Sequence, residues 1–444
     1  MKFQNYILTV AICSLFACSN EDDPVKTTVI EPDAILSLMV ENEDASTLKS
    51  TKADPSDFEN LDKNINTLTL AVFNQGAYED KELGLLVALK TVKNTNGGSI
   101  EGLAVHSGPV DVLVFGNLPE QVLTLNSTKL SDITGGVLSA GLKDEETQLT
   151  MGSAVHRVII QSEKVNCMGY SDKYITEHNN SASAEGKDGY VSLYQSDKTQ
   201  PGIKLYRNVA RIQLKSITLA PLKEYSENAD FTLTSLFVAN VKSKTRLTSA
   251  EEWGRVEYTT PSGNAADFWL CGAFAEEEGA LKIGQATEYD NLFIQLREPG
   301  VAESIEHKDL VVHLSGNETY SAEKRKGGVI GKTFYVYENA DEQTNHTLLV
   351  LCGTYKYTPE DQDTPVTVNG FYAVTVNKPG EGHLSEGMSG EWTPYIKRNF
   401  NYSVNVTVKT PGSKKSYDPE INAYLSAAVK VEPWNVKDIH EDVE

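Results

Sequence analysis

Residues 399–410 read NFNYSVNVTVKT, in which polar and apolar side chains alternate from Asn399 to Lys409. Alternation with a period of two over this length predicts a β-strand that buries one face. The side chains on the predicted buried face are Tyr402, Val404, Val406 and Val408. A second apolar run, AYLSAAVKVEPWNV at 423–436, continues nearly to the end of the sequence. This last strand must pair either within its own domain or with another chain, because unpaired strand edges are costly.

Strand patterns also fill most of the chain before this stretch. We expect strands at 34–40, 68–73, 110–115, 155–160, 203–217, 231–241, 334–337 and 347–352. At 366–374 the sequence VTVNGFYAV predicts a hairpin with an Asn-Gly turn. The polar residues 171–190 are expected to form a loop, and long segments with the 3.6-residue period of a helix are nearly absent. The sequence therefore predicts a mainly β fold, most simply two β-sandwiches.

The composition limits the classes of function. A chain of 444 residues holds about two or three domains. The 40 Lys and Arg residues face 62 Asp and Glu residues, which gives a net charge of −22. This charge argues against binding to nucleic acid or to an anionic membrane by electrostatic attraction.

The first seventeen residues have the pattern of a targeting signal. Lys2 supplies a positive charge, and YILTVAICSLF at 6–16 is an apolar run too short to span a membrane as a helix. The following Cys18, in the sequence LFAC, resembles a bacterial lipobox, in which this cysteine becomes the lipidated N-terminus. The alternative is an ordinary secretory signal with a chance cysteine. The acidic residues 19–23 resemble a signal for export to the outer cell surface.

A short predicted strand follows this signal and is separated from the rest of the chain. In AILSLMV at 34–40, one face carries Ala34, Leu36, Leu38 and Val40. Residues 41–64 are charged and rich in turn formers, and exposed segments of this kind are where proteases cut. The first strand is therefore expected to be joined to the main body by a cleavable link.

The sequence predicts no active site. It contains no GxSxG, HExxH, P-loop or dinucleotide-binding glycine motif, and its histidines are scattered. The acidic clusters 276–278 and 361–363 lack EF-hand spacing, and solvated loops are the favoured interpretation. Tyr355 and Tyr357 could form a sugar-binding platform, but half-buried sheet residues are favoured. We therefore expect that the protein is not an enzyme and that it binds no cofactor and no metal ion.

Several segments, in order, resemble the fimbrillin family, the FimA-like subunits of type V fimbriae. Near the N-terminus these are AILSLMV at 34–40, LTLAVFNQG at 68–76 and VDVLVFGNLP at 110–119. The later segments are RNVARIQL at 207–214, FYVYEN at 334–339, HTLLVLCGTY at 346–355, KRNFNYSVNVTVKTPG at 397–412 and AYLSAAVKVEPWNV at 423–436. The resemblance covers almost the whole chain and depends on the order and spacing of these segments.

The resemblance implies two transthyretin-like β-sandwich domains in tandem and a precursor that is processed. The implied division is a lipoprotein signal peptide at 1–17, a lipidated propeptide at 18–52, and domains at 53–205 and 206–444. It implies a non-enzymatic subunit of a cell-surface fimbria that supports adhesion or biofilm formation. Its partners would be other fimbrial subunits, the outer membrane through the lipid on Cys18, and a host protein or glycan.

The family polymerises by strand exchange, in which a protease removes the lipidated segment and its first strand. The C-terminal strand of another subunit then fills the groove. The donor residues implied here are Val429, Val431, Trp434, Val436 and Ile439. We expect 399–432 to close the chain's own sandwich and the residues from Trp434 onward to be donated.

The processing site departs from the family, whose members are cut after Arg, because this chain has no Arg before Arg157. The bond between Lys52 and Ala53 matches best, and the bond between Lys49 and Ser50 is second. Either a lysine-tolerant protease cuts here, or the chain is an uncut anchor or tip accessory subunit. A surface glycan-binding lipoprotein is the alternative from another class of function.

Overall fold

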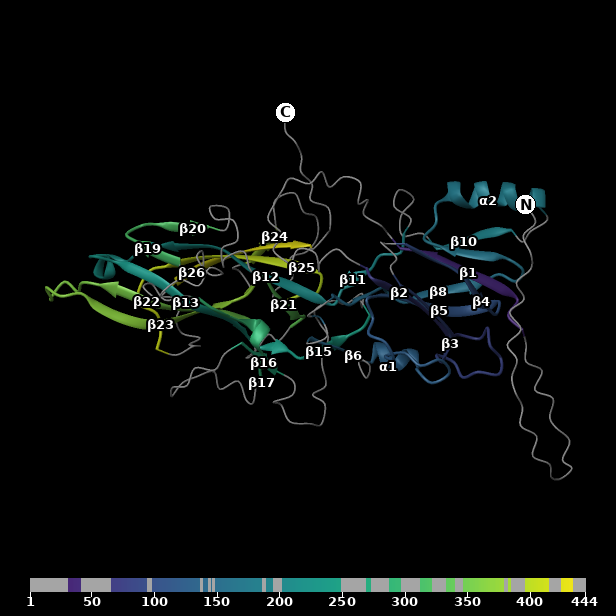
Figure 1. Ribbon diagram of the computed structural model, residues 1–444, viewed down its shortest axis with the longest axis horizontal. Coiled ribbons are helices and arrows are strands. Elements are labelled where there is room, and N and C mark those ends of the chain that lie inside the picture. The colour runs from purple at the N-terminus through teal and green to yellow at the C-terminus, as the bar shows by residue number, and fades with distance from the viewer. Residues whose placement is uncertain are drawn as a thin grey trace, which may run out of the picture.

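The computed structural model shows a mainly β protein, which confirms the predicted fold class (Figure 1). The structure describes residues 31–40, 65–93, 98–135, 139–142, 145, 148–185, 189–194, 202–248, 269–272, 287–296, 312–321, 333–339, 346–378, 382–384, 396–414 and 425–433. Its sheets fall into two groups along the long axis of the molecule, with the N-terminal group at the right of Figure 1.

Two sheets form the N-terminal group. The first runs in the order β10 (Tyr190–Tyr194), β9 (Val165–Met168), β1 (Ala34–Met39) and β4 (Ser99–Val105). The second runs in the order β11 (Tyr206–Arg207), β7 (Met151–Gly152), β5 (Gly108–Gly116), β2 (Thr67–Asn74) and β3 (Leu86–Lys93), and β8 (His156–Ile160) also pairs with β5. Apolar side chains from both sheets form one buried cluster between them, so the two sheets are the layers of a sandwich.

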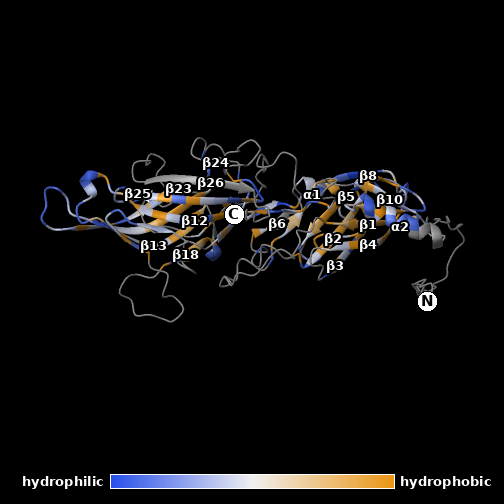
Figure 2. Cartoon of the chain, turned by 90° about the horizontal axis from the view of Figure 1, so that it is seen from above, coloured by the Kyte–Doolittle hydropathy of each residue, from blue (hydrophilic) through white to orange (hydrophobic). Residues whose placement is uncertain are grey.

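Two larger sheets form the C-terminal group. One contains β20 (Thr319–Ser321), β12 (Val209–Leu219), β25 (Phe400–Val408), β26 (Leu425–Pro433) and β24 (Gly382–Leu384), with β21 (Thr333–Tyr337) beside β12. The other contains β18 (Phe293–Gln295), β13 (Asp230–Ala239), β22 (Leu348–Tyr357) and β23 (Val366–Thr375), with β19 (Val312–Ser315) beside β13. The hydropathy view shows apolar residues along the strands and hydrophilic residues at the tips (Figure 2).

The alternation in β25 has the predicted consequence. Tyr402, Val404, Val406 and Val408 are each at most 1% exposed. β25 is a central strand, because it pairs in parallel with β12 and antiparallel with β26. Its apolar face therefore packs into the core of the C-terminal sheets, as expected for the buried face of a strand.

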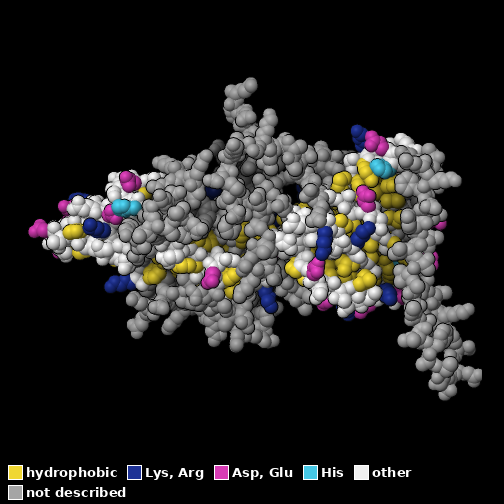
Figure 3. Space-filling model, in the orientation of Figure 1, with side chains coloured by type: hydrophobic (Ala, Val, Ile, Leu, Met, Phe, Trp, Pro, Cys, Tyr) yellow, Lys and Arg dark blue, Asp and Glu magenta, His cyan; other side chains and the backbone are white. Residues whose placement is uncertain are grey.

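Small elements complete the described fold. These are the helices α1 (Leu130–Thr134) and α2 (Asp172–Glu185), the 3₁₀ helices η2 (Lys223–Tyr225) and η4 (Asp290–Leu292), and the short strands β6 (Ser139–Gly141), β14 (Val241–Lys242), β15 (Lys244–Arg246), β16 (Trp269–Cys271) and β17 (Thr287–Glu288). On the face seen in Figure 3, apolar side chains are exposed between single acidic and basic ones. Within the described residues, no helix is long and apolar enough to cross a bilayer.

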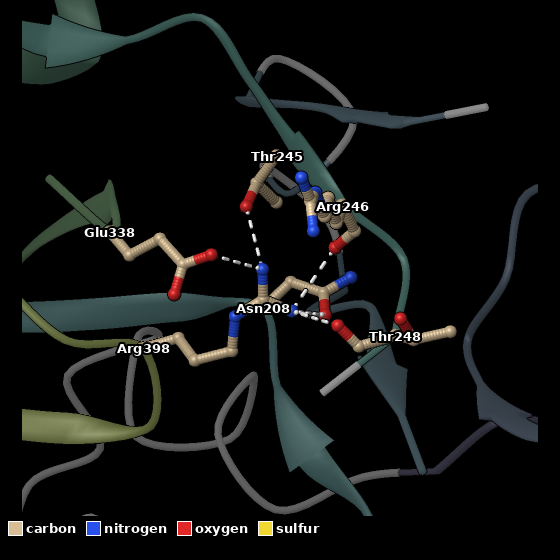
Figure 4. Close-up of polar contacts among 6 residues, drawn as sticks. All are labelled: Asn208, Thr245, Arg246, Thr248, Glu338 and Arg398. Atoms are coloured by element: carbon tan, nitrogen blue, oxygen red, sulfur yellow. Dashed lines mark hydrogen bonds and ion pairs between the residues drawn. The ribbon is translucent and has the colours of Figure 1, made fainter. Parts of the chain in front are cut away.

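The two groups of sheets are joined by a buried polar network around Arg398 (Figure 4). Its Nη2 lies 2.6 Å from Oε1 of Glu338, and both side chains are 3% exposed. The guanidinium also donates hydrogen bonds of 2.8 to 3.1 Å to oxygen atoms of Asn208, Thr245, Arg246 and Thr248. The segment that holds Thr245 is β15, which pairs with β6 of the N-terminal half. Arg398 thus ties the start of β25 to a strand pair that links the halves.

The predicted domain boundary at 205 and 206 stays a prediction. The expected strand at 203–217 is divided, because β11 pairs with β7 in the N-terminal group and β12 begins two residues later in the C-terminal group. One apolar cluster includes Phe115 from the first group and Val209 from the second. The halves therefore share apolar contacts as well as the Arg398 network.

The predicted hairpin at 366–374 is wrong. β23 runs through Asn369 and Gly370 without a turn, and both residues pair with β22. A Cβ on Gly370 would lie 2.7 Å from the Cα of Gly412, so glycine is needed here for a close backbone approach. The hairpin turn lies instead between Tyr357, the last residue of β22, and Val366, the first residue of β23, which pair with each other.

The predicted loop at 171–190 is also wrong, because residues 172–185 form α2. The backbone N–H of Tyr174 donates to Oγ of Ser171, which satisfies one of the free N–H groups of the first turn. Asp172 adds a favourable negative charge in that turn. The helix was missed because its described side chains are mostly polar or half-exposed, which leaves no apolar stripe to detect.

Candidate functional site: the first strand and its groove

The first strand, β1, is a central strand with a partner on each side. Its residues 35–38 pair in parallel with 165–168 of β9. On the other side, Ala34 to Met39 pair antiparallel with β4 from Val105 to Ser99. Both partners are distant in sequence, and residues 41–64 connect β1 to β2. Loss of β1 would leave a gap between two strands whose facing N–H and C=O groups had lost their partners.

The inner face of β1 fills the sandwich core. Ala34 is 6% exposed, Leu36 and Leu38 are 0% exposed, and Val40 is 1% exposed. All four pack in the cluster that includes Val72 and Val112 of the facing sheet. Burial of each Leu or Val side chain contributes about 1.5–3 kcal/mol. The three larger side chains together therefore hold the strand with roughly 5–9 kcal/mol.

The space between β9 and β4 that β1 occupies, called the groove below, contacts the backbone of β1 closely. Gly169 has φ +77°, and a Cβ there would lie 2.2 Å from the carbonyl oxygen of Met39. The N–H of Ile203 donates to that same oxygen at 2.9 Å. At a bulge between Leu36 and Leu38, the N–H of Gly102 donates to Oγ of Ser37 at 3.3 Å. These contacts fix the strand at one register in the groove.

Asp33 anchors the start of the strand. Its carboxylate accepts hydrogen bonds from the N–H of Ser107 at 2.7 Å and from Oγ of Ser107 at 2.6 Å. The Ser107 hydroxyl is the main cause that lowers the pKa of the Asp33 carboxyl to about 2. The backbone carbonyl of Asp33 accepts a hydrogen bond from the N–H of Glu163 at 2.8 Å. Asp33 is therefore bound by the turn before β5 and by the turn before β9.

The outer face of β1 is also covered at its middle. Ser37 is 6% exposed and Cys167, its partner on β9, is 1% exposed. Burial, followed by the charge of Glu101, raises the pKa of the Cys167 thiol to about 12. Tyr170 is buried next to this region, and its ring contacts the ring of Tyr174 of α2 in a tilted arrangement, with centroids 4.4 Å apart. The thiol is consequently a buried apolar group in this position.

The C-terminal strand lies in the chain's own sheet. β26 pairs with β25, where Val429 faces Val404 and Val431 faces Tyr402, and it also pairs in parallel with β24. The other donor residues of the sequence prediction, Trp434, Val436 and Ile439, lie outside the described residues. The same is true of the predicted lipidation and processing residues, Cys18, Lys49, Ser50, Lys52 and Ala53.

Several residues of the groove were not expected from the sequence. Asp33 directly precedes the apolar run at 34–40, and this position could have indicated a polar anchor at the start of the strand. Its partner Ser107 lies 74 residues away, and Gly169 approaches β1 only through the sheet. Asn166 donates from Nδ2 to the carbonyl oxygen of Ile35 across 131 residues. No local pattern reports contacts at such separations.

The structure places Tyr355, one of the two tyrosines of the suggested sugar platform, in the core. Tyr355 is 0% exposed, and its hydroxyl donates to the carbonyl oxygen of Tyr225 at 3.1 Å. This side chain belongs to the core and offers no ring face to a ligand. Within the described parts of the chain, no three or more His, Cys, Asp or Glu side chains are placed to hold a metal ion.

Solved structures of fimbrial and cell adhesion proteins have an architecture similar to this one. A candidate cell adhesion protein from Parabacteroides distasonis ATCC 8503 superposes with a TM-score of 0.62 at 25% identity, over 91% of this chain and 100% of that chain. A fimbrilin (FimA) from Porphyromonas gingivalis W83 superposes with a TM-score of 0.54 at 16% identity, over 91% of this chain and 98% of that chain. The second likeness shows a shared fold.

Residues 34–193 match the family of the major fimbrial subunit protein (FimA). The match begins at the first residue of β1 and ends within β10, so it covers most of the N-terminal pair of sheets. The resemblance to the fimbrillin family is thereby confirmed. A comparison with curated protein sequences gives no match.

Proposed function

We propose that the chain is a non-enzymatic structural subunit of a cell-surface fimbria, which polymerises by proteolysis-triggered strand exchange and supports adhesion. The observation that carries the proposal is the position of β1. It is buried and paired on both sides, yet in sequence it is joined to β2 only through the charged residues 41–64. The match of 34–193 to a fimbrial subunit family supports the same assignment.

The chemistry of exchange follows from the groove. When β1 leaves, β9 and β4 lose their hydrogen-bonding partners and the inner pockets lose Leu36, Leu38 and Val40. An incoming strand restores the backbone ladder, while its alternate side chains refill the pockets. The proposed donor is the C-terminal segment of another subunit, with Trp434, Val436 and Ile439 as the side chains that enter the pockets.

In the proposed life cycle, a lipid on Cys18 first holds the precursor at the outer membrane. A cut between Lys52 and Ala53, or between Lys49 and Ser50, then frees the main body from the lipidated segment. The partners are further copies of this chain, accessory and anchor subunits of the same fimbria, and a host protein or glycan. The N-terminal residue of the form found on cells tests this step, and we expect Ala53 or Ser50.

Polymerisation is tested by making the cut independent of the natural protease. Residues 46–52 are replaced by the recognition sequence of a site-specific protease in a chain that lacks residues 1–18. Cutting should convert monomers into high-mass polymers, measured by light scattering and electron microscopy. A scrambled recognition sequence is the control. Deletion of 434–444 should leave a folded monomer that does not assemble, and stable monomers after complete cutting of the full chain would contradict strand exchange.

An uncut anchor or tip subunit is the second candidate, because no Arg precedes Arg157. In this case the form on the cell surface would retain the lipid on Cys18 and the link at 41–64. Mass spectrometry of the surface protein distinguishes the two roles, because only the processed subunit lacks the lipidated segment.

A further inference from the structure

The groove has a polar site at the end where β1 begins. The carboxylate of Asp33 accepts two hydrogen bonds from Ser107, at 2.7 Å from the backbone N–H and at 2.6 Å from Oγ. The N–H of Glu163 holds the adjoining backbone carbonyl at 2.8 Å. Three donors thus converge on Asp33, the residue directly before the strand.

These donors belong to the body of the subunit. Ser107 lies between β4 and β5, and the N–H of its neighbour His106 donates to the hydroxyl of Tyr78 at 3.1 Å. The rings of His106 and Tyr78 are in edge contact, with centroids 4.3 Å apart. Gly108 has φ +122°, and a Cβ there would lie 2.9 Å from the Cα of Ala77. The turn is held by contacts that do not involve β1, so the two donors of Ser107 are expected to stay in place when β1 leaves.

We propose that the backbone N–H and the hydroxyl of Ser107 form a carboxylate-binding site that selects an acidic side chain on a strand that fills the groove and sets its register, while the N–H of Glu163 holds the adjoining backbone carbonyl. The proposal rests on strand exchange as the function of the groove. The occupant in the fimbria is the segment 434–444 of a second copy of this chain. This segment continues directly from β26 in the sequence, and its carboxylates are Asp438, Glu441, Asp442 and Glu444. Because they follow Trp434 and Val436, the proposal places the incoming strand in the direction opposite to that of β1, so that its acidic end reaches Ser107.

A register anchor has a clear physical use here. A slip of one residue would turn every inner side chain of the incoming strand outward, and a slip of two would shift each one to the wrong pocket. Apolar pockets alone discriminate poorly between neighbouring small side chains, whereas a bound carboxylate is tied to one position. The acidic residues of 434–444 therefore supply what the apolar side chains of that segment lack.

The test uses the full chain with the introduced protease site, cut so that added peptides compete for the groove. Fluorescent peptides of residues 31–40 carry Asp33, Asp33→Asn or, as a matched control two residues away, Glu31→Gln. We expect Asp33→Asn to weaken binding about three- to tenfold, because it replaces exposed charge-assisted hydrogen bonds by neutral ones. Glu31→Gln should bind like the natural peptide. The loss should shrink when the body carries Ser107→Ala.

A second peptide, residues 425–444, tests the occupant. Conversion of its four C-terminal carboxylates to amides should weaken binding at least threefold, and this loss should also depend on Ser107. Equal binding of the natural peptide and the Asp33→Asn peptide would overturn the carboxylate site, and equal binding of the acidic and amide tails would overturn the occupant. If no peptide binds at all, strand exchange itself is refuted, so failure of the site and failure of the function give different results.

Discussion

Replacement of Leu38 by Ala provides a sharp test of how β1 is held. Leu38 is 0% exposed in the inner cluster, and truncation removes the buried methyl groups and leaves a cavity. A change of this kind costs about 2–5 kcal/mol. A factor of ten in an equilibrium constant corresponds to about 1.4 kcal/mol, so the cut subunit should retain the variant strand about 30-fold to about 4,000-fold less tightly. Release of β1 should accelerate, and polymers should form sooner.

The matched control is Ile35→Ala on the same strand. Ile35 points away from the core and is 38% exposed, so its truncation should cost less than about 1 kcal/mol. The assay labels the N-terminal segment and measures its release after the cut, and urea unfolding of the uncut chain gives the stability of each variant. Equal release of the two variant strands would refute the claim that the inner pockets hold β1.

Three further predictions concern the backbone, the joint and the acid response. Gly169→Ala should lower the unfolding temperature more than Gly84→Ala. The two glycines have nearly the same φ, +77° and +76°, but only a Cβ on Gly169 would meet the backbone, at 2.2 Å from the carbonyl oxygen of Met39. Arg398→Met should cost about 3–5 kcal/mol, because it removes the ion-pair partner of the buried Glu338 carboxylate. Loss of the exposed ion pair in Lys93→Ala should leave the unfolding temperature nearly unchanged in the same measurement. The pKa of Asp33 is lowered from 3.8 to about 2, so its stabilisation of the folded strand is present above about pH 4 and is lost as the pH falls toward 2. Hydrogen exchange at the start of β1 should therefore accelerate between about pH 4 and about pH 2. Asp33→Asn should remove this pH dependence.

Period-two alternation predicted the strands whose two faces differ in burial. It identified the inner faces of β1 and β25 residue by residue, because each strand packs one apolar face into a core. Alternation carries no information about partners. That β1 lies between β9 and β4 depends on contacts across the fold, and no feature of 34–40 reports them.

The two wrong predictions have related physical causes. Asn-Gly favours a hairpin turn, but Gly370 sits where the segment at Gly412 crosses β23, so tertiary packing overrode the local preference. In α2, a cap at Ser171 and contacts with β10 stabilise a helix without a strong apolar stripe. Asp33 is visible in the sequence directly before the strand, but its role could not be predicted, because it depends on Ser107 lying next to it in the fold.

The proposed role of proteolysis is clearest when β1 is treated as a tethered ligand. While residues 41–64 are intact, β1 competes for its groove at an effective concentration on the order of millimolar. A strand of another subunit at micromolar concentration is then at a disadvantage of about a thousandfold, even if it makes equally good contacts. The cut breaks none of the contacts of β1, and only removes this advantage, so that the released strand can be diluted away. It follows that free peptide 31–40, added at millimolar concentration to the cut subunit, should restore the competition and suppress polymerisation.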